Sequence, residues 1–305
     1  MPKKRITAAK KKETIFLFLM LALPVVQWLI YFFYLNIDSI LLAFQDKRTG
    51  AFTFQNFQLV WEQLVDPRGD INIAIKNTMI YFSTDFLIIL PLSLLMSYFF
   101  YKKILFYKGF RVIFYLPAIV SAMVMVESFA SFVAPNGPVA TVLEWFGYTI
   151  PPQGLFADSD TATNTIVIYC IWTGFCSKVL LFGGAMARIP VELLESARLD
   201  GCGPFRELWQ MIFPLIWATT STQIVLLFTG LFNSSGPILL FTNGAYDTQT
   251  LNYWIFAQIY GSGKYGGNTG NYNIVSCTGL CFTLVGVPVI LFIRWLMDRV
   301  PAVEY

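Results

Sequence analysis

Three ionisable residues, Asp85, Glu127 and Lys178, lie within segments that are otherwise apolar. A charged side chain at the centre of a membrane-spanning helix costs roughly 2.5–3.5 kcal/mol on insertion scales, so such groups normally face a bundle interior, a partner or a water-filled path. The chemistry open to these residues is ion pairing or contact with a polar solute. Lys178 can pair with Asp85, or its long stem can carry the ammonium towards the inner surface while both acids reach outer water.

A solute path lined by these charges is the sharper hypothesis, and Lys178 would then favour an acidic sugar such as a uronate. Trp172 and Asn233 are further candidates for the path, because aromatic rings and hydrogen-bonding side chains suit sugars. Both residues fit equally well as anchors at the membrane interface, where aromatic side chains are enriched.

Catalytic and metal chemistry are disfavoured by the residues that the chain lacks. It contains no histidine, which removes histidine metal ligands, nucleophiles paired with histidine and histidine proton relays. It contains five cysteines, an odd number without zinc-like spacing, so a disulfide framework is not expected. We predict no catalytic residue, no metal site and no cofactor bound by this chain.

The composition predicts an integral membrane protein. Of 305 residues, 56% are hydrophobic and 13% are charged, about half the charged share of a soluble domain. Six apolar segments have the length of about 20 residues that a membrane-spanning helix needs. They divide residues 15–297 into spans at about 15–35, 77–100, 112–133, 164–187, 213–232 and 274–297.

The basic residues predict the orientation of these spans. With the N-terminus inside, the inner segments 1–14, 101–111, 188–212 and 298–305 and the adjoining helix ends hold fifteen of the 21 lysines and arginines. Cytoplasmic loops carry such an excess of positive charge. Both termini are therefore expected in the cytoplasm, with a basic N-terminus at 1–14 and a tail at 298–305.

A polar, charged stretch at 189–214 separates the fourth and fifth spans. Pro190 suits the first position of a helix, and Glu192 and Glu195 suit the positive end of its dipole. Gly201 stands where a C-terminal cap is expected, and Pro204 begins a second helical segment that runs towards the next span. The pattern predicts a short helix, a glycine turn and a second helix.

This stretch resembles the cytoplasmic "EAA" loop of ABC importer permeases that work with extracellular binding proteins, and the Ala-x-x-Asp-Gly run resembles the carbohydrate branch. Glu195, Ala197, Gly201 and Pro214 fall on the family pattern, and Asp200 completes the run. Ser196, Met211 and Phe213 depart from it by small or apolar exchanges. An ordinary cytoplasmic hairpin between two spans is the plainer interpretation.

The resemblance implies an all-α integral membrane protein of six transmembrane helices, with the type I ABC importer permease fold and a coupling helix between spans four and five. It implies a subunit in a bacterial cytoplasmic membrane that passes a sugar or oligosaccharide inwards. The implied partners are membrane lipid, a second homologous permease, two ATPase subunits that carry ATP and Mg, and an extracellular solute-binding lipoprotein. The implied ATPase-coupling residues are Glu195, Ser196, Ala197, Asp200, Gly201 and Pro214.

Two other classes of function remain as alternatives. A stand-alone secondary transporter or channel for a small polar solute would typically show internal repeats, and none is evident. A membrane-embedded enzyme would need a nucleophile and a base, and no such pair is recognisable. Residues 261–264 resemble a phosphate-binding loop, but Tyr265 stands where serine or threonine is required. The small net charge of +3 gives no indication of nucleic-acid binding.

Overall fold

The computed structural model describes residues 8–147, 150–234, 236–261 and 271–300. The described part is helical, apart from one isolated bridge between Gln45 and Phe52. The first part of the basic N-terminus, most of the tail and the greater part of 261–264 lie outside the described residues. The chain divides into two compact units, Met1–Val60 with Asn271–Cys281, and Trp61–Gly270 with Phe282–Tyr305.

The smaller unit is built on one long helical run followed by an ordered turn. The run comprises α1 (Ala8–Trp28), the π-helical η1 (Leu29–Tyr34) and α2 (Leu35–Ala43), so it extends beyond the span expected at 15–35. The amide of Asn56, at the start of α3 (Gln55–Val65), donates to the carbonyls of Ala43 and Gln45, each at 2.9 Å. Asn273 in α16 donates to the same Gln45 carbonyl at 2.8 Å. Two buried amides thereby satisfy the backbone that is freed where α2 ends.

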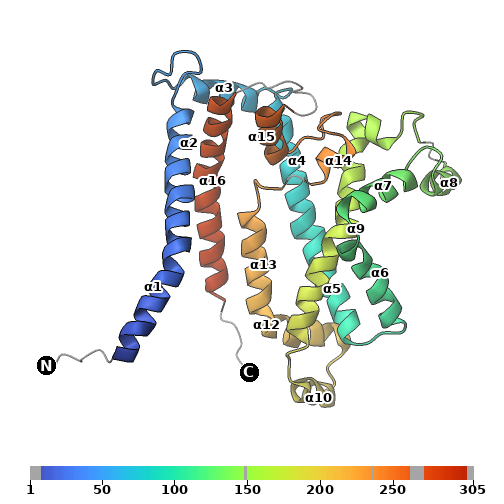
Figure 1. Ribbon diagram of the computed structural model, residues 1–305. Helices are drawn as coiled ribbons and strands as arrows, with labels where there is room; N and C mark the ends of the chain where they lie inside the picture. Colours follow the sequence, from blue (N-terminus) through green and yellow to red (C-terminus); the bar gives the residue numbers. More distant parts are fainter. Residues whose placement is uncertain (1–7, 148–149, 235, 262–270, 301–305) are drawn as a thin grey trace. The chain divides into compact units, whose positions relative to one another are not determined.

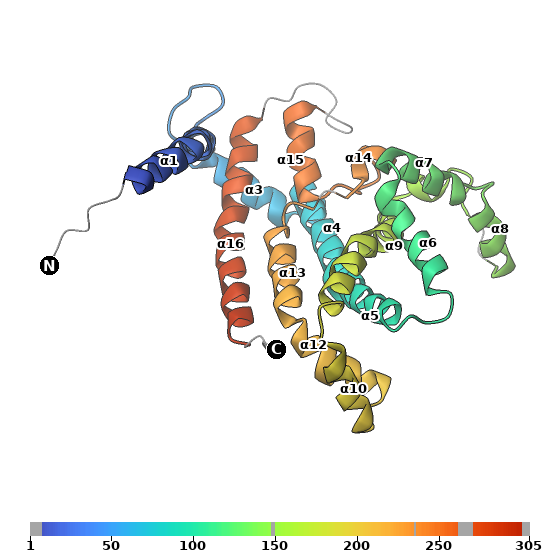
Figure 2. The same cartoon turned by 60° about the horizontal axis from the view of Figure 1, so that its bottom comes forward.

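The larger unit holds the remaining helices. Its elements are α4 (Asp70–Thr84), η2 (Asp85–Ile89), α5 (Leu90–Tyr101), α6 (Tyr107–Ile119), α7 (Ala122–Phe132), α8 (Pro138–Trp145), η3 (Leu155–Ala157), α9 (Ser159–Met186), α10 (Val191–Leu199), α11 (Pro204–Arg206), η4 (Glu207–Ile212), α12 (Phe213–Leu215), α13 (Trp217–Thr229), α14 (Ile238–Phe241), α15 (Leu251–Tyr260) and the greater part of α16 (Tyr272–Asp298). Within this unit α10 lies beside α12 at one end, and α14 and α15 lie at the other (Figures 1 and 2).

Four helical runs among the described residues are long and apolar enough to cross a membrane, at Lys11–Ala43, Asp70–Tyr101, Ser159–Met186 and Tyr272–Asp298. The segments expected as single spans at 112–133 and 213–232 are instead bent pairs. The chain bends by 112° between Tyr107–Ile119 and Ala122–Phe132. It bends by 74° between Pro204–Leu215 and Trp217–Thr229. The first bend follows from the extended backbone of Val120 and Ser121, three residues after the helix-weakening Pro117. Counting each bent pair as one span gives six.

Helices α5 and α9 pack closely along each other. The Ser97 hydroxyl donates to the Val179 carbonyl at 2.9 Å, and Ser93 lies 3.5 Å from the Phe175 carbonyl. A Cβ at Gly174 of α9 would lie 3.0 Å from Cδ1 of Ile89, the last residue of η2, so the Ile89 side chain packs directly over the glycine. Small residues and interhelical hydrogen bonds of this kind hold helices together where lipid removes the hydrophobic driving force. The two helices are therefore held together by interhelical hydrogen bonds and close packing.

The loop between α14 and α15 packs against α4. Asn77 donates its amide to the carbonyls of Asp247 and Gln249, at 2.6 and 2.9 Å. Thr250 then caps α15, since its hydroxyl accepts from the backbone N–H of Tyr253. Helix α15 is thereby held at the end of the unit opposite to α10 (Figure 1).

Candidate functional site

The polar stretch forms two limbs joined by a glycine turn. Helix α10 (Val191–Leu199) is the first limb, and α11, η4 and α12 together form the second. The predicted helix–glycine–helix arrangement is therefore present in the structure. The second limb does not continue straight into the next span, because the chain bends at Ile216, where α13 begins.

One face of α10 is anchored and the other is open. Leu194 and Ala197 are buried, and Leu194 joins a core cluster built from α5, α9 and η4. Glu192, Glu195 and Ser196 are exposed on α10 itself. Leu199, at the end of the helix, is 89% exposed. Acidic groups beside an exposed leucine, on a helix fixed from behind, form a surface suited to docking another protein.

Gly201 ends α10 in a Schellman-type cap. Its φ of +77° lies in the left-handed region, and the backbone N–H of Cys202 donates to the Ala197 carbonyl at 3.0 Å. A Cβ placed on Gly201 would have no atom within 4 Å, so the requirement for glycine comes from the backbone conformation and not from crowding. The predicted cap at Gly201 is therefore present in the structure.

The remaining predicted residues of this loop take different positions. Asp200 is exposed at the turn, and the Ser196 hydroxyl donates to the Leu193 carbonyl at 3.0 Å. Pro214 is half-buried in α12, two residues before the bend at Ile216. Glu195, Ser196 and Asp200 are thus exposed on the loop, while Ala197 and Pro214 pack into it and Gly201 forms its turn.

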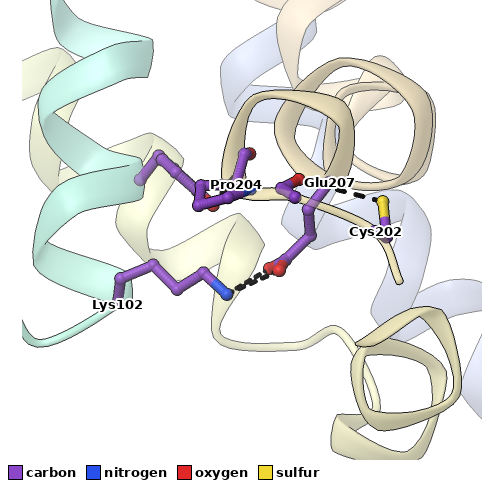
Figure 3. Close-up of polar contacts among 6 residues, drawn as sticks. Lys102, Cys202, Pro204 and Glu207 are labelled. Atoms are coloured by element: carbon purple, nitrogen blue, oxygen red, sulfur yellow. Dashed lines mark hydrogen bonds and ion pairs between the residues drawn. The ribbon is translucent and has the colours of Figure 1, made fainter. Parts of the chain in front are cut away.

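An ion pair behind this loop involves residues that the sequence did not single out. The Lys102 ammonium lies 2.5 Å from one Glu207 carboxylate oxygen and 2.6 Å from the other. Figure 3 shows the lysine reaching from α5 to the carboxylate at the start of η4. The two residues are 105 positions apart, so no local pattern indicates the pair. The sequence indicates only that Glu207 lies near the start of a helix and that Lys102 lies in an inner loop.

The charges within the apolar segments do not gather at one place. Lys178 on α9 pairs with Asp85, the first residue of η2. Glu127 is exposed on α7 and forms no ion pair with the described residues. Trp172 packs among aromatic rings, with ring centroids 6.2 Å from those of Phe129 and Tyr169. Asn233 is exposed after α13, and its carbonyl accepts from the Asn252 amide at 2.9 Å.

The chemistry of these sites is limited to contact and charge. Among the described residues, no group of three or more cysteine, aspartate or glutamate side chains is placed to hold a metal ion. The five cysteines are free thiols. The structure contains a helix with exposed acidic side chains, a glycine turn and two ion pairs between helices.

Comparison with known sequences covers most of the chain. The profile of the family described as "Binding-protein-dependent transport system inner membrane component" matches residues 79–301. Protein LplB of Bacillus subtilis (strain 168) is 25% identical over 300 residues, which cover 96% of this chain and 91% of LplB. The galactooligosaccharides transport system permease protein GanP of the same organism is 29% identical over 177 residues, covering 54% of this chain and 41% of GanP.

A third relative and two solved structures extend the comparison. The maltose/maltodextrin transport system permease protein MalF of Escherichia coli (strain K12) is 32% identical over 92 residues, 30% of this chain and 18% of MalF. A crystal structure of a bacterial ABC transporter involved in the import of the acidic polysaccharide alginate matches 95% of this chain and 98% of its own, at 21% identity and a TM-score of 0.77. A structure of the alginate transporter in complex with alginate pentasaccharide-bound periplasmic protein matches 96% and 97%, at 20% identity and a TM-score of 0.78. At these identities the likeness establishes the fold.

Proposed function

Because the chain belongs to the family of inner membrane components of binding-protein-dependent transport systems, we propose that it is a permease subunit of an ATP-driven importer of a sugar or oligosaccharide. The observation that carries the proposal is the two-limbed loop, in which α10 is anchored through Leu194 and presents Glu192 and Glu195. Membership of this family disfavours a stand-alone transporter, since the family works with a binding protein.

The proposed assembly contains partners that supply the chemistry absent from this chain. Two ATPase subunits carry ATP and Mg, and one of them receives α10 in a cleft. A second permease completes the path through the membrane, and an external solute-binding lipoprotein delivers the solute. Closure of the ATPases moves the coupling loop and changes the side to which the path opens, a rigid-body switch between two states.

The proposed solute is a saccharide. GanP and MalF are permeases for galactooligosaccharides and maltodextrins, and the structural neighbours belong to an importer of alginate. The pairing of Lys178 with Asp85 reduces the positive charge that would select an acidic sugar. A neutral oligosaccharide and a uronate oligosaccharide are therefore the two substrates to compare in transport assays.

The proposed orientation places both termini and α10 in the cytoplasm, on the basis of the lysine and arginine distribution. A chain with Cys202 replaced by serine, carrying a single new cysteine at Glu192 or at the exposed Arg68, tests it. An impermeant thiol reagent added to intact cells should label Arg68→Cys and spare Glu192→Cys until the membrane is opened. The opposite pattern would reverse the orientation.

Co-purification tests the assembly. A tagged chain, expressed with the ATPase and second permease encoded beside it, should recover both proteins. Glu195→Lys reverses one charge on the exposed face of α10 and should reduce recovery of the ATPase while the second permease is retained. Glu144→Lys makes the same change at an exposed position of α8 and serves as the matched control. Equal ATPase recovery from both variants would remove Glu195 from the docking surface, and uptake without ATP would exclude the importer itself.

A further inference from the structure

The second limb of the coupling loop is tied to α5 by a buried carboxylate. Glu207 has only 2% of its side chain exposed, and Lys102 has 21%. Both carboxylate oxygens lie within 2.6 Å of the Lys102 ammonium, so this cation compensates the buried negative charge (Figure 3). A charge is buried in this way only where a partner compensates it, because desolvation of a lone carboxylate is costly.

A second contact strengthens this attachment. The Tyr98 hydroxyl, one turn before Lys102 on α5, donates to the Pro204 carbonyl at 3.0 Å. The Lys102 ammonium also lies 5.7 Å from the centre of the Tyr98 ring, within the range of a cation–π contact. Lys102 is the C-cap residue of α5, and Glu207 follows the first turn of the second limb, so each charge sits at the helix end that favours it. The last turn of α5 therefore holds the second limb at two points.

The two limbs differ in how firmly they are held to the bundle. The second limb is held by charge, by a hydrogen bond and by Leu208 and Ile212, which are buried in the cluster formed with α5 and α9. Helix α10 joins that limb through the turn at Gly201 and contributes Leu194 to the same cluster. Helix α5 in turn is joined to α9 through Ser93 and Ser97.

We propose that Lys102, Glu207 and Tyr98 form a latch that makes α5 and α9 move with the coupling loop. The proposal rests on the proposed function, in which the loop is displaced by an ATPase. The three are positioning residues, since none of them meets nucleotide or solute. Without the latch the loop would still bind its partner through α10, but its displacement would be absorbed at the second limb instead of moving the helices of the path.

The experiment uses the full chain in its assembled complex, reconstituted in vesicles with the ATPase, the second permease and the binding protein. The principal variant is Lys102→Met/Glu207→Met, because replacing both members of a buried pair by apolar residues is close to neutral for stability. Three quantities are measured, namely the recovery of the complex, ATP hydrolysis and solute uptake. The latch predicts normal recovery and persistent hydrolysis, with uptake per ATP reduced about tenfold, as coupling energies in contiguous networks allow.

A charge reversal and a matched control complete the design. Lys102→Glu/Glu207→Lys restores the ion pair with its polarity exchanged and should regain most of the uptake per ATP. Arg294→Met/Asp298→Asn removes an ion pair at the end of α16, where the side chains are 67% and 73% exposed and 3.9 Å apart, and should change nothing. A merely structural pair would alter recovery of the complex without changing uptake per ATP.

The outcomes separate the latch from the proposed function. If the unaltered chain recovers no ATPase or shows no ATP-dependent uptake, the importer itself is rejected before any variant is compared. If the unaltered complex transports and the double methionine variant keeps its uptake per ATP, the latch is wrong and the importer stands. If the double methionine variant does not assemble, whether or not the reversed pair restores assembly, the pair is structural and the latch is rejected.

Discussion

The two ion pairs of the larger unit resemble each other in construction and differ in which partner is buried. In each pair a lysine reaches an acid that begins a π-helical segment, Glu207 in η4 and Asp85 in η2. At the coupling loop the acid is the buried member, with 2% of its side chain exposed. Within the apolar segments the lysine is the more buried member, at 16% against 37% for Asp85. Removing the lysine is therefore expected to destabilise the fold more at the coupling loop, and removing the acid is expected to destabilise it more within the apolar segments.

The two pairs tolerate substitution at different partners. The cost of breaking a buried pair comes mostly from the charge that remains without compensation. At the coupling loop the more buried charge, which needs compensation, is the Glu207 carboxylate. In the apolar segments it is the Lys178 ammonium. A wider π-helical turn at both acids is in keeping with the occurrence of such segments at functional positions.

The largest effect is expected from Lys102→Met, which removes the ammonium that pairs with the buried Glu207 carboxylate. Loss of one partner of a buried pair costs about 3–5 kcal/mol of folding free energy, and we expect a value near the lower end because Lys102 is partly exposed. Glu207→Gln should cost less, since the lysine can turn towards water. Thermal unfolding of the detergent-solubilised chain compares them, and a larger loss for Glu207→Gln would invert the comparison.

The second effect is expected within the apolar segments, where loss of the acid should cost more than loss of the lysine. Asp85→Asn leaves the Lys178 ammonium without its partner and should cost about 2.5 kcal/mol, the insertion penalty of a lone lysine. Lys178→Met alone should cost less, and Asp85→Asn/Lys178→Met should recover most of the loss in yield and melting temperature.

Transport by the same variants distinguishes the two roles of this pair. If Lys178→Met assembles normally and changes the ratio of uronate to neutral oligosaccharide uptake, the pair lines the solute path. If assembly recovers only in the double variant and the solute ratio is unchanged, the pair is structural. Lys178→Met with normal assembly and an unchanged ratio would contradict both roles.

The third effect concerns the glycine turn, which depends on a backbone conformation and not on an ion pair. Gly201→Ala places a Cβ in a left-handed residue and should cost about 1 kcal/mol. Gly203→Ala is the matched control, because Gly203 has a φ of −74° and equally open space around its Cβ position. Melting temperatures of the two variants give the comparison. Equal costs would mean that the turn does not depend on the left-handed conformation.

The fold was largely accessible from the sequence. Long apolar segments predicted the helices, and the structural neighbours confirm the all-helical importer permease fold. The bend between α6 and α7 was missed, because residues 112–133 are as apolar as an uninterrupted span. Pro117 was visible there, but the proline alone does not reveal that Val120 and Ser121 become extended.

The coupling loop was accessible to the extent that its contacts are local. A capped helix is predicted by three residues within a dozen positions, Pro190, Glu195 and Gly201, and the structure contains the cap. The pairing of Lys178 with Asp85 was one of two alternatives that depth along the helices allowed, and the structure contains the pair. Lys102 and Glu207 were not recognised, since a contact across 105 residues depends on packing that no short pattern encodes.

The smallest effect is expected at Asp46, a partly exposed residue whose carboxylate is held by backbone groups instead of by a lysine. Its Oδ1 accepts from the N–H of Thr49 at 3.0 Å and from that of Arg48 at 2.6 Å. The two backbone hydrogen bonds lower the pKa of Asp46, since they favour the charged form. A carboxyl whose pKa is lower in the folded chain than in the unfolded chain stabilises the fold above its unfolded pKa, and this contribution is lost as the pH falls through the folded pKa. Asp46→Asn should therefore lower the melting temperature slightly at neutral pH, and the difference from the unaltered chain should vanish in acid. A difference that grows on acidification would mean that the carboxylate does not order this turn.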